Sequence, residues 1–378
     1  MEQQLPKNFE AYAEGRKNGF LKIKSVKESG RHVAGYFCTF APLEIFDAAG
    51  VLAVSLCGMS GETIPDAEAE LPKNICPLVK SSYGFALAEK CPYTYYADMI
   101  VGETTCDAKK KMYERLGKLK DMYVMQLPQG IDEAYAKPMM VKEVKLLAKY
   151  VENKFGVTIT DEALRKAAVK RNEYRHALVE LMELQHEVPA PIPSVQLYKF
   201  MDSIKFNFDL DAAIASVHEL KAKLMVEKAP KENEKRIMVT GCPIGGVLDK
   251  VVGAIENNGG RVVCYENCSG IKATRCYVDT DASDIYEALA DAYMKIGCSV
   301  MTPNPRRMEN IPNLVNEFKV DGIIDVTLQT CHTYMIETRA VRKLCEGIGK
   351  PYMSLETDYS HSDDGQIDTR IAAFIETI

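Results

Sequence analysis

The sequence predicts an α/β protein with two doubly wound, parallel-sheet (Rossmann-like) domains joined by a helical segment. Strand and helix patterns alternate over residues 31–128, helical patterns alone fill residues 136–232, and strict alternation resumes at residue 236. Such alternation is typical of a parallel sheet with helices on both faces. A chain of 378 residues suits two or three domains. We expect an N-terminal α/β domain at 1–135, a helical linker or cap at 136–232, and a C-terminal α/β domain at 233–378.

The elements of the N-terminal domain follow from apolar runs and turn residues. Pro42 opens a helix, Gly50 follows its end, and Pro128 ends a strand. In chain order we predict a strand at 31–40, a helix at 42–50, strands at 51–57 and 95–106, a helix at 108–119 and a strand at 121–128.

The middle segment shows apolar residues at helical spacing and contains no cysteine. Thr160 or Asp161 is the expected N-cap of its second helix. The predicted helices cover residues 141–156, 160–185 and 209–229.

A charged hinge, KAPKENEKR at 228–236, leads into the C-terminal domain, where strands and helices alternate strictly. The two α/β halves show no internal repeat in their sequences. The predicted strands lie at 236–241, 261–268, 320–331 and 351–358, and the predicted helices at 248–260, 283–297, 333–349 and 365–378.

Composition limits the classes of function. The net charge of −6 gives no broad basic surface, so we expect no binding to nucleic acid. The first twenty residues have no apolar core of a secretory signal, and no stretch is long and apolar enough to span a membrane. We therefore expect a cytoplasmic protein. Its twelve cysteines are then candidates for packed thiols, reactive thiols or metal ligands rather than disulfides.

Many of the cysteines fall where a predicted strand ends. Ligands of doubly wound sheets collect beyond the carboxyl ends of the strands. Helix N-termini also favour the thiolate, which is the form that binds soft metals. In such positions lie Cys38, Cys106, Cys242, Cys268 and Cys331, while Cys76 precedes Pro77 in a loop that leads into a helix.

Several thiolates together would suit zinc or an iron–sulfur cluster. Neither the close C-x₂-C pair of a zinc ribbon nor the ferredoxin run C-x₂-C-x₂-C is present. Even without these motifs, the positions of the cysteines at strand ends favour a metal site. Buried thiols or a single nucleophile are the alternative. Cys57, Cys264, Cys345, Cys276 and Cys91 are interpreted as structural.

Six stretches resemble one family: GYFCTFAPLEIFDAAG, CPLVKSSYG, GETTCDAKKKMYE, VTGCPIGG, QTCHTY and ETDYSHSDDGQIDTRIAAFIE. They are similar to subunits of (R)-2-hydroxyacyl-CoA dehydratases and benzoyl-CoA reductases, and most of all to the branch of double-cubane cluster proteins. The similarity runs from about residue 30 to the end of the chain and is weakest in the helical middle.

The resemblance implies a ligand set. The three cysteines that hold one 4Fe–4S cluster in the dehydratases match Cys76, Cys106 and Cys331. The double-cubane branch implies an 8Fe–9S cluster held by six thiolates. Cys242 and Cys268 are chosen for their places at strand ends, and Cys298 is slightly preferred to Cys38 as the sixth.

The resemblance also implies an enzyme: an iron–sulfur reductase whose electrons come from a separate, ATP-hydrolysing activator protein with its own 4Fe–4S cluster. A homodimer and a small-molecule substrate are expected with it. One alternative is an (R)-2-hydroxyacyl-CoA dehydratase subunit with a single 4Fe–4S cluster. The other is an electron carrier without catalysis.

Other residues near these motifs carry weaker expectations. GCPIGG lacks both the dinucleotide and the P-loop pattern, so its glycines are expected to let backbone approach a cluster. Glu103 and Glu266 are candidates for proton relay or helix capping. Structural or surface roles are expected for His332, Arg306, Arg307, Asp358, Arg370 and the run Lys109–Lys111.

Overall fold

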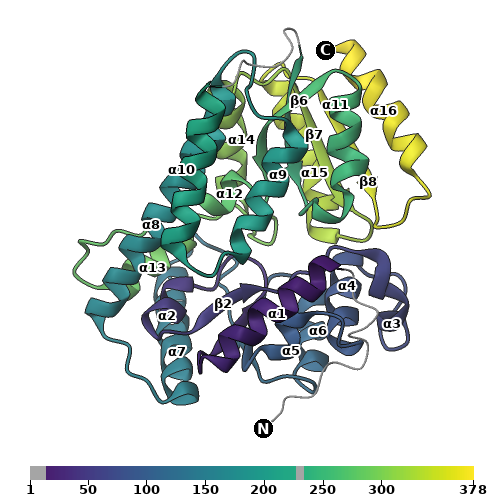
Figure 1. Cartoon of the computed structure of the whole chain (residues 1–378). Helices are drawn as coiled ribbons and strands as arrows, with labels where there is room; N and C mark the ends of the chain where they lie inside the picture. The colour runs from purple at the N-terminus through teal and green to yellow at the C-terminus, as the bar shows by residue number, and fades with distance from the viewer. Residues whose placement is uncertain (1–13, 227–233) are drawn as a thin grey trace. The chain divides into compact units, whose positions relative to one another are not determined.

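The computed structural model describes residues 14–226 and 234–378 (Figure 1). It divides into two compact units. Unit 1 comprises residues 1–169 and 278–294, and unit 2 comprises residues 170–277 and 295–378. The predicted domain boundaries at residues 135 and 232 rest on the pattern of expected strands and helices, and they stay a prediction. The predicted hinge lies largely outside the described residues.

Unit 1 is built around a four-stranded parallel sheet with the order β2-β1-β3-β4. Helix α2 contacts α7, and α4 contacts α6. The strand β3 is buried along its whole length, as expected of a central parallel strand. Its strands are β1 (Val33–Tyr36), β2 (Leu52–Ser55), β3 (Met99–Glu103) and β4 (Met122–Met125). Its helices are α1 (Glu14–Glu28), α2 (Leu43–Ala48), α3 (Ile64–Glu68), α4 (Pro77–Leu87), α5 (Pro92–Tyr96), α6 (Asp107–Leu116), α7 (Ala136–Phe155) and α13 (Ile285–Tyr293).

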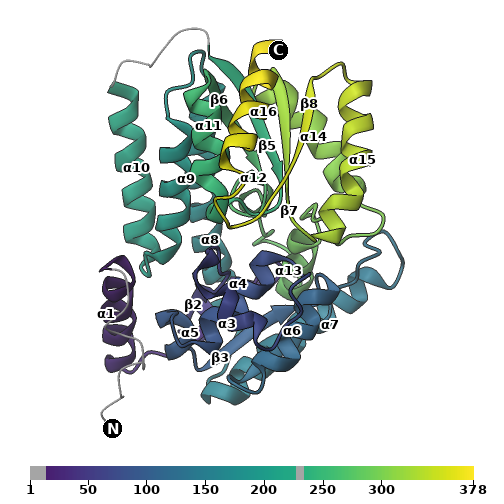
Figure 2. The same ribbon diagram turned by 90° about the vertical axis from the view of Figure 1, so that its right-hand side faces the viewer.

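Unit 2 has a second four-stranded parallel sheet, with the order β6-β5-β7-β8. Figure 2 shows helices on both of its faces, with α11 and α16 on one side and α14 and α15 on the other. Its strands are β5 (Lys235–Gly241), β6 (Gly260–Glu266), β7 (Gly322–Leu328) and β8 (Tyr352–Thr357). Its helices are α9 (Ser194–Ser203), α10 (Leu210–Val226), α11 (Ala254–Asn257), α12 (Ile271–Thr274), α14 (Pro305–Glu317), α15 (His332–Gly347) and α16 (Asp364–Thr377). Helix α8 (Asp161–Glu183) crosses from one unit to the other.

The predicted fold class is confirmed. Each predicted strand overlaps an observed one. Thr160 is the N-cap side chain of α8, because its Oγ1 accepts the N–H of Ala163 at 3.1 Å. The helix predicted at 248–260 differs in detail, since its first part, Asp249–Gly253, is a π-helix that continues into α11.

The two sheets have the same topology, although the sequences of the two halves show no internal repeat. In each sheet the first strand lies beside the second and the third, and the fourth is at the edge. The cysteines occupy matching places, after the first, second and third strands and within the connection between the second and the third. The matching pairs are Cys38 with Cys242, Cys57 with Cys268, Cys76 with Cys298, and Cys106 with Cys331.

Gly241, at the end of β5, has a conformation that only glycine adopts easily. Its φ is +104°, and a Cβ atom there would lie 2.2 Å from the backbone oxygen of Val326. We expect Gly241→Ala to lower the free energy of unfolding of unit 2 by about 2 kcal/mol or more, because a neighbouring strand would have to move. Urea denaturation followed by circular dichroism measures this. Gly253→Ala is the control, since nothing lies within 4 Å of its added methyl group. Equal stability of the two variants would contradict the prediction.

Candidate functional site

Three candidate ligands lie directly before helices. Cys76, Cys106 and Cys331 are the N-cap residues of α4, α6 and α15. All three are partly exposed. None of the three side chains caps its helix by a hydrogen bond. A sulfur in this place is nevertheless near the positive end of the helix dipole, which favours its thiolate form. Cys76 and Cys106 belong to unit 1, and Cys331 belongs to unit 2.

Cys242 follows β5 directly and is buried, with 1% of its surface exposed. Its Sγ accepts the backbone N–H of Leu328 at 3.4 Å, and its own N–H donates to the carbonyl oxygen of Val326 at 2.8 Å. The sulfur is therefore held between the ends of β5 and β7. The chain adds β6 on one side of β5 and β7 on the other, and ligands of doubly wound sheets bind at such a switch point.

Cys268 is close enough to Cys298 in unit 2 to act on it electrostatically. Burial raises the pKa of the Cys298 thiol to about 12, Cys268 contributes to the rise, and the Lys272 ammonium acts against it. Beside Cys268, the amide Nδ2 of Asn267 is buried and has no hydrogen-bond partner within residues 14–226 and 234–378. A sulfur-containing group bound near Cys268 would find a donor there.

A buried charge cluster lies near these two sulfurs and consists of Glu266, Lys272, Arg307, Asp325 and Glu337. Lys272 Nζ lies 3.1 Å from Glu266 Oε1 and donates to the Tyr334 hydroxyl at 3.1 Å. The side chains of both Lys272 and Glu266 are 1% exposed. Charges so deeply buried require partners of opposite sign.

Arg307 joins the acidic members of this cluster. Its guanidinium is completely buried, lies 3.4 Å from Glu266 Oε2 and 3.7 Å from Asp325 Oδ1, and contacts Glu337. Burial acts to lower the pKa of Arg307, but the carboxylates outweigh it and raise that pKa above its ordinary value. Burial also raises the pKa of Asp325, against the effect of Arg307. The expected surface role is wrong for Arg307, whereas Arg306 is 45% exposed.

A second polar group is buried in unit 1 around Lys109. The Lys109 ammonium donates to Cys38 Sγ at 2.9 Å and to Cys57 Sγ at 3.9 Å. It also lies over the ring of Phe37, 5.3 Å from the ring centroid. The expectation that the run Lys109–Lys111 is solvated is therefore wrong for Lys109, which is 5% exposed. We call Cys38, Cys57, Glu103, Lys109 and Tyr113 the Lys109 cluster.

Glu103 ends β3 and is 0% exposed. Its Oε1 accepts the backbone N–H groups of Phe40 and Ala41 at 3.1 and 3.0 Å. Its Oε2 has no hydrogen-bond partner in the described part of the chain. Burial raises the pKa of this carboxyl group to about 7, although Lys109 and the two N–H groups act to lower it. Glu103 can therefore change its charge near neutral pH.

The cysteines interpreted as structural take several positions. Cys264, Cys276 and Cys345 are buried. Cys91 is the N-cap residue of α5, where its sulfur accepts the N–H of Thr94 at 3.4 Å. Cys57 lies beyond β2 rather than within it, as part of the Lys109 cluster.

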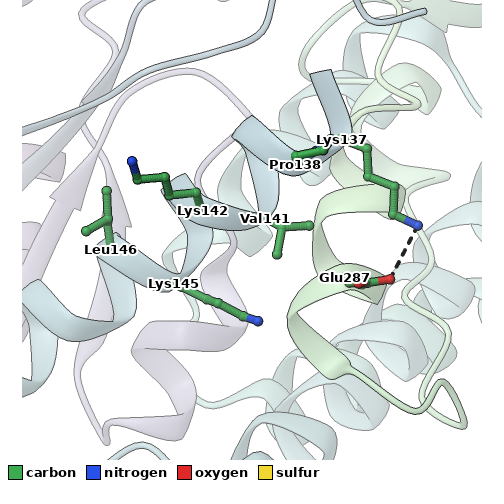
Figure 3. A pocket seen from close by; sticks show the side chains of 7 residues that line it. All are labelled: Lys137, Pro138, Val141, Lys142, Lys145, Leu146 and Glu287. Carbon is green, nitrogen blue, oxygen red and sulfur yellow. Dashed lines mark ion pairs between the residues drawn. The ribbon is translucent and has the colours of Figure 1, made fainter. Parts of the chain in front are cut away.

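Outside the two buried clusters, few features of the described chain suggest a binding site. No three His, Cys, Asp or Glu side chains of the described residues are grouped so as to hold a metal ion. None of the described helices could cross a membrane. Figure 3 shows a hollow of about 550 Å³ on α7 and α13, lined by Lys137, Pro138, Val141, Lys142, Lys145, Leu146 and Glu287. It contains no candidate ligand, and Lys137 lies 3.6 Å from Glu287 across it.

The described chain therefore consists of two α/β units with the same sheet order and with cysteines at strand ends and helix N-caps. Comparison with known sequences shows which family it belongs to. Residues 38–378 match the family described as 2-hydroxyglutaryl-CoA dehydratase, D-component, and the chain belongs to this family.

Individual relatives agree with this assignment. The chain is 45% identical over 381 residues to YjiM of Escherichia coli (strain K12), covering 99% of this chain and 98% of that protein, whose assignment as a dehydratase subunit is provisional. It is 25% identical over 362 residues to the (R)-phenyllactyl-CoA dehydratase beta subunit of Clostridium sporogenes, covering 94% of each chain. It is 22% identical over 359 residues to the beta subunit of lactoyl-CoA dehydratase from Anaerotignum propionicum, covering 93% of each.

Proposed function

We propose that this chain is the iron–sulfur component of a reductase that acts on a small molecule. The observation that carries the proposal is the repeated placement of thiols at strand ends and helix N-caps within a chain of this family. When bound, a double-cubane 8Fe–9S cluster would supply low-potential electrons for the reduction. The proposed ligands are Cys76, Cys106, Cys242, Cys268, Cys298 and Cys331.

The donor chemistry of these residues fits an iron–sulfur cluster. All are thiols, three are N-cap residues, and Cys242 accepts a backbone N–H, an interaction that stabilises a thiolate. The sixth ligand is assigned to Cys298 rather than Cys38, because the Lys109 ammonium donates directly to Cys38 Sγ. In unit 2 the matching region has an unpartnered Asn267 amide among the described residues.

The buried charge cluster would support the thiolates of Cys268 and Cys298. Removing the proton from the buried Cys298 thiol is costly, as its raised pKa indicates. Lys272 acts to lower the pKa of Cys298. Lys272 is held by its ion pair with Glu266, which also pairs with Arg307. By positioning Lys272, Glu266 and Arg307 would help to stabilise the thiolate form of Cys298, which is the form that binds iron.

The proposed partners are a second copy of the chain and an ATP-hydrolysing activator protein. The sequence has no phosphate-binding loop, so nucleotide hydrolysis is assigned to the activator. A cytoplasmic location is proposed with this function.

The names of the relatives favour a second candidate, dehydration of an (R)-2-hydroxyacyl-CoA by a chain that holds one 4Fe–4S cluster through Cys76, Cys106 and Cys331. The two candidates differ in their iron content. A third, an electron carrier without catalysis, predicts reduction of the cluster without turnover of any small molecule.

We expect about eight iron ions per chain after purification without oxygen, since two cubanes hold four each. Chemical quantification of iron and sulfide, with electron paramagnetic resonance of the reduced protein, measures this. About four iron ions per chain would support the dehydratase instead. A colourless protein without iron, with all twelve thiols titratable, would reject every iron–sulfur function.

A further inference from the structure

Glu103 has the features of a group that exchanges protons, and this inference rests on the proposed reductase function. Reduction of a small molecule consumes protons as well as electrons. We propose that the Glu103 carboxyl group supplies protons to the reaction at the carboxyl end of β3, where Cys106 lies. In each step the carboxylic acid gives up its proton, remains as a carboxylate that the positive charge of Lys109 stabilises, and is protonated again from solvent. The electrons come from the proposed activator.

The geometry supports more than a structural role. Capping the two N–H groups of Phe40 and Ala41 requires only Oε1. The second oxygen, Oε2, is buried and has no hydrogen-bond partner among the described residues. An amide or hydroxyl group would serve the capping function as well, and an unpartnered carboxyl oxygen adds a cost of burial. Together with its raised pKa, this oxygen makes the Glu103 carboxyl group a candidate for proton exchange.

Two side-chain contacts connect Lys109 with Thr105, the residue before Cys106. Lys109 Nζ donates to Cys38 Sγ at 2.9 Å, and Cys38 Sγ lies 3.8 Å from Thr105 Oγ1. Thr105 directly precedes Cys106, and its N–H donates to the carbonyl oxygen of Glu103.

The charge of Glu103 depends on the groups packed around it. The titratable groups that interact with it electrostatically are Lys109 and Tyr113 from α6 and Cys38 after β1. Burial raises the pKa of the Cys38 thiol and that of the Tyr113 phenol well above their ordinary values, so both stay neutral. Lys109 is then the cation that faces Glu103.

Glu266 provides an internal comparison. It is equally buried, but Lys272 and Arg307 lie 3.1 and 3.4 Å from its two oxygens. The Glu103 carboxyl group instead accepts two backbone N–H groups through Oε1, and Lys109 is the cation that acts to lower its pKa. The two carboxyl groups therefore differ in their surroundings, and the raised pKa of Glu103 suits it to gain and lose a proton.

The test uses the full-length chain with its iron and compares wild type with Glu103→Gln, which keeps an acceptor for both N–H groups. Infrared spectroscopy detects the carboxylic acid directly. We expect wild type to show a buried carboxylic acid band that disappears as pH rises, with a midpoint near pH 7. Glu103→Gln should lack this band, and Glu114→Gln, which changes an exposed glutamate of α6, should keep it. A Glu103 that is ionised from pH 5 to pH 9 would overturn the proposal.

Activity provides the second measurement. Wild-type turnover should fall as pH rises through about 7, because the proton donor is lost. Glu103→Gln should reduce turnover about tenfold or more below pH 7, remove that pH dependence and leave the iron content unchanged. Unchanged turnover in a variant with full iron would overturn this proposal alone. Absence of iron from wild type would end the proposed function as well. If Glu103→Gln fails to fold, the infrared titration of wild type and the pH profile of Glu103→Asp decide the question.

Discussion

Replacing Arg307 with methionine is expected to lower the free energy of unfolding of unit 2 by about 3–5 kcal/mol. The guanidinium is completely buried and lies against the carboxylates of Glu266, Asp325 and Glu337. Methionine fills a similar volume, so the loss comes from carboxylates left buried with too little positive charge. Urea denaturation followed by circular dichroism at pH 7 measures the change.

Two variants control this experiment. Arg306→Met makes the same substitution at the neighbouring arginine, whose side chain is 45% exposed. It should change the free energy of unfolding by less than about 0.5 kcal/mol. Arg307→Lys keeps the positive charge and should lose less than Arg307→Met. If Arg307→Met is as stable as Arg306→Met, the buried charge cluster does not depend on Arg307.

Replacing Cys106 with alanine is expected to remove at least half of the bound iron. Under the proposed function its sulfur is a ligand at the N-cap of α6, and alanine has no atom that binds iron. Because metal binding contributes to folding energy, the variant should also unfold at a lower temperature than wild type. Iron analysis and thermal denaturation of protein purified without oxygen measure both effects.

Cys345→Ala is the matched control for the loss of one sulfur. Cys345 is completely buried within α15 and is not among the proposed ligands. It should therefore leave the iron content unchanged, whatever it does to stability. Equal iron contents in the Cys106→Ala and Cys345→Ala variants would show that the assignment of cysteines as iron ligands or as structural residues is wrong.

The fold class could be predicted because buried parallel strands have a simple signature. The strands MIVGE and GIIDVTL are buried at every position and appear in the sequence as runs of apolar and small residues with few polar exceptions. The places of Cys106, Cys242 and Cys331 at strand ends followed from the same pattern. The conformation of the loops after the strands decides which sulfurs approach each other, and such loops have no periodic signature.

Lys109 and Arg307 were missed because charged residues are usually solvated. A signal was nevertheless present in both helices. Lys109 shares a helical stripe with Met112, Tyr113 and Leu116, which are all buried. Arg307 shares another with Ile311, Leu314 and Val315. A charged residue in register with an apolar stripe indicates a buried ion pair or polar contact, which helps to locate a site.

The allocation of α13 to unit 1 affects how the protein can be divided. Residues 278–294 lie in the second half of the sequence, yet Lys137 and Lys145 of α7 pair with Asp291 and Asp284 there. The Tyr293 hydroxyl also donates to Glu44 of α2. A fragment that stops at residue 169 would expose the surfaces of α2 and α7 that this return segment covers. To express unit 1 by itself, residues 278–294 must be joined to residues 1–169 by a new linker, because truncation at a single point would remove them.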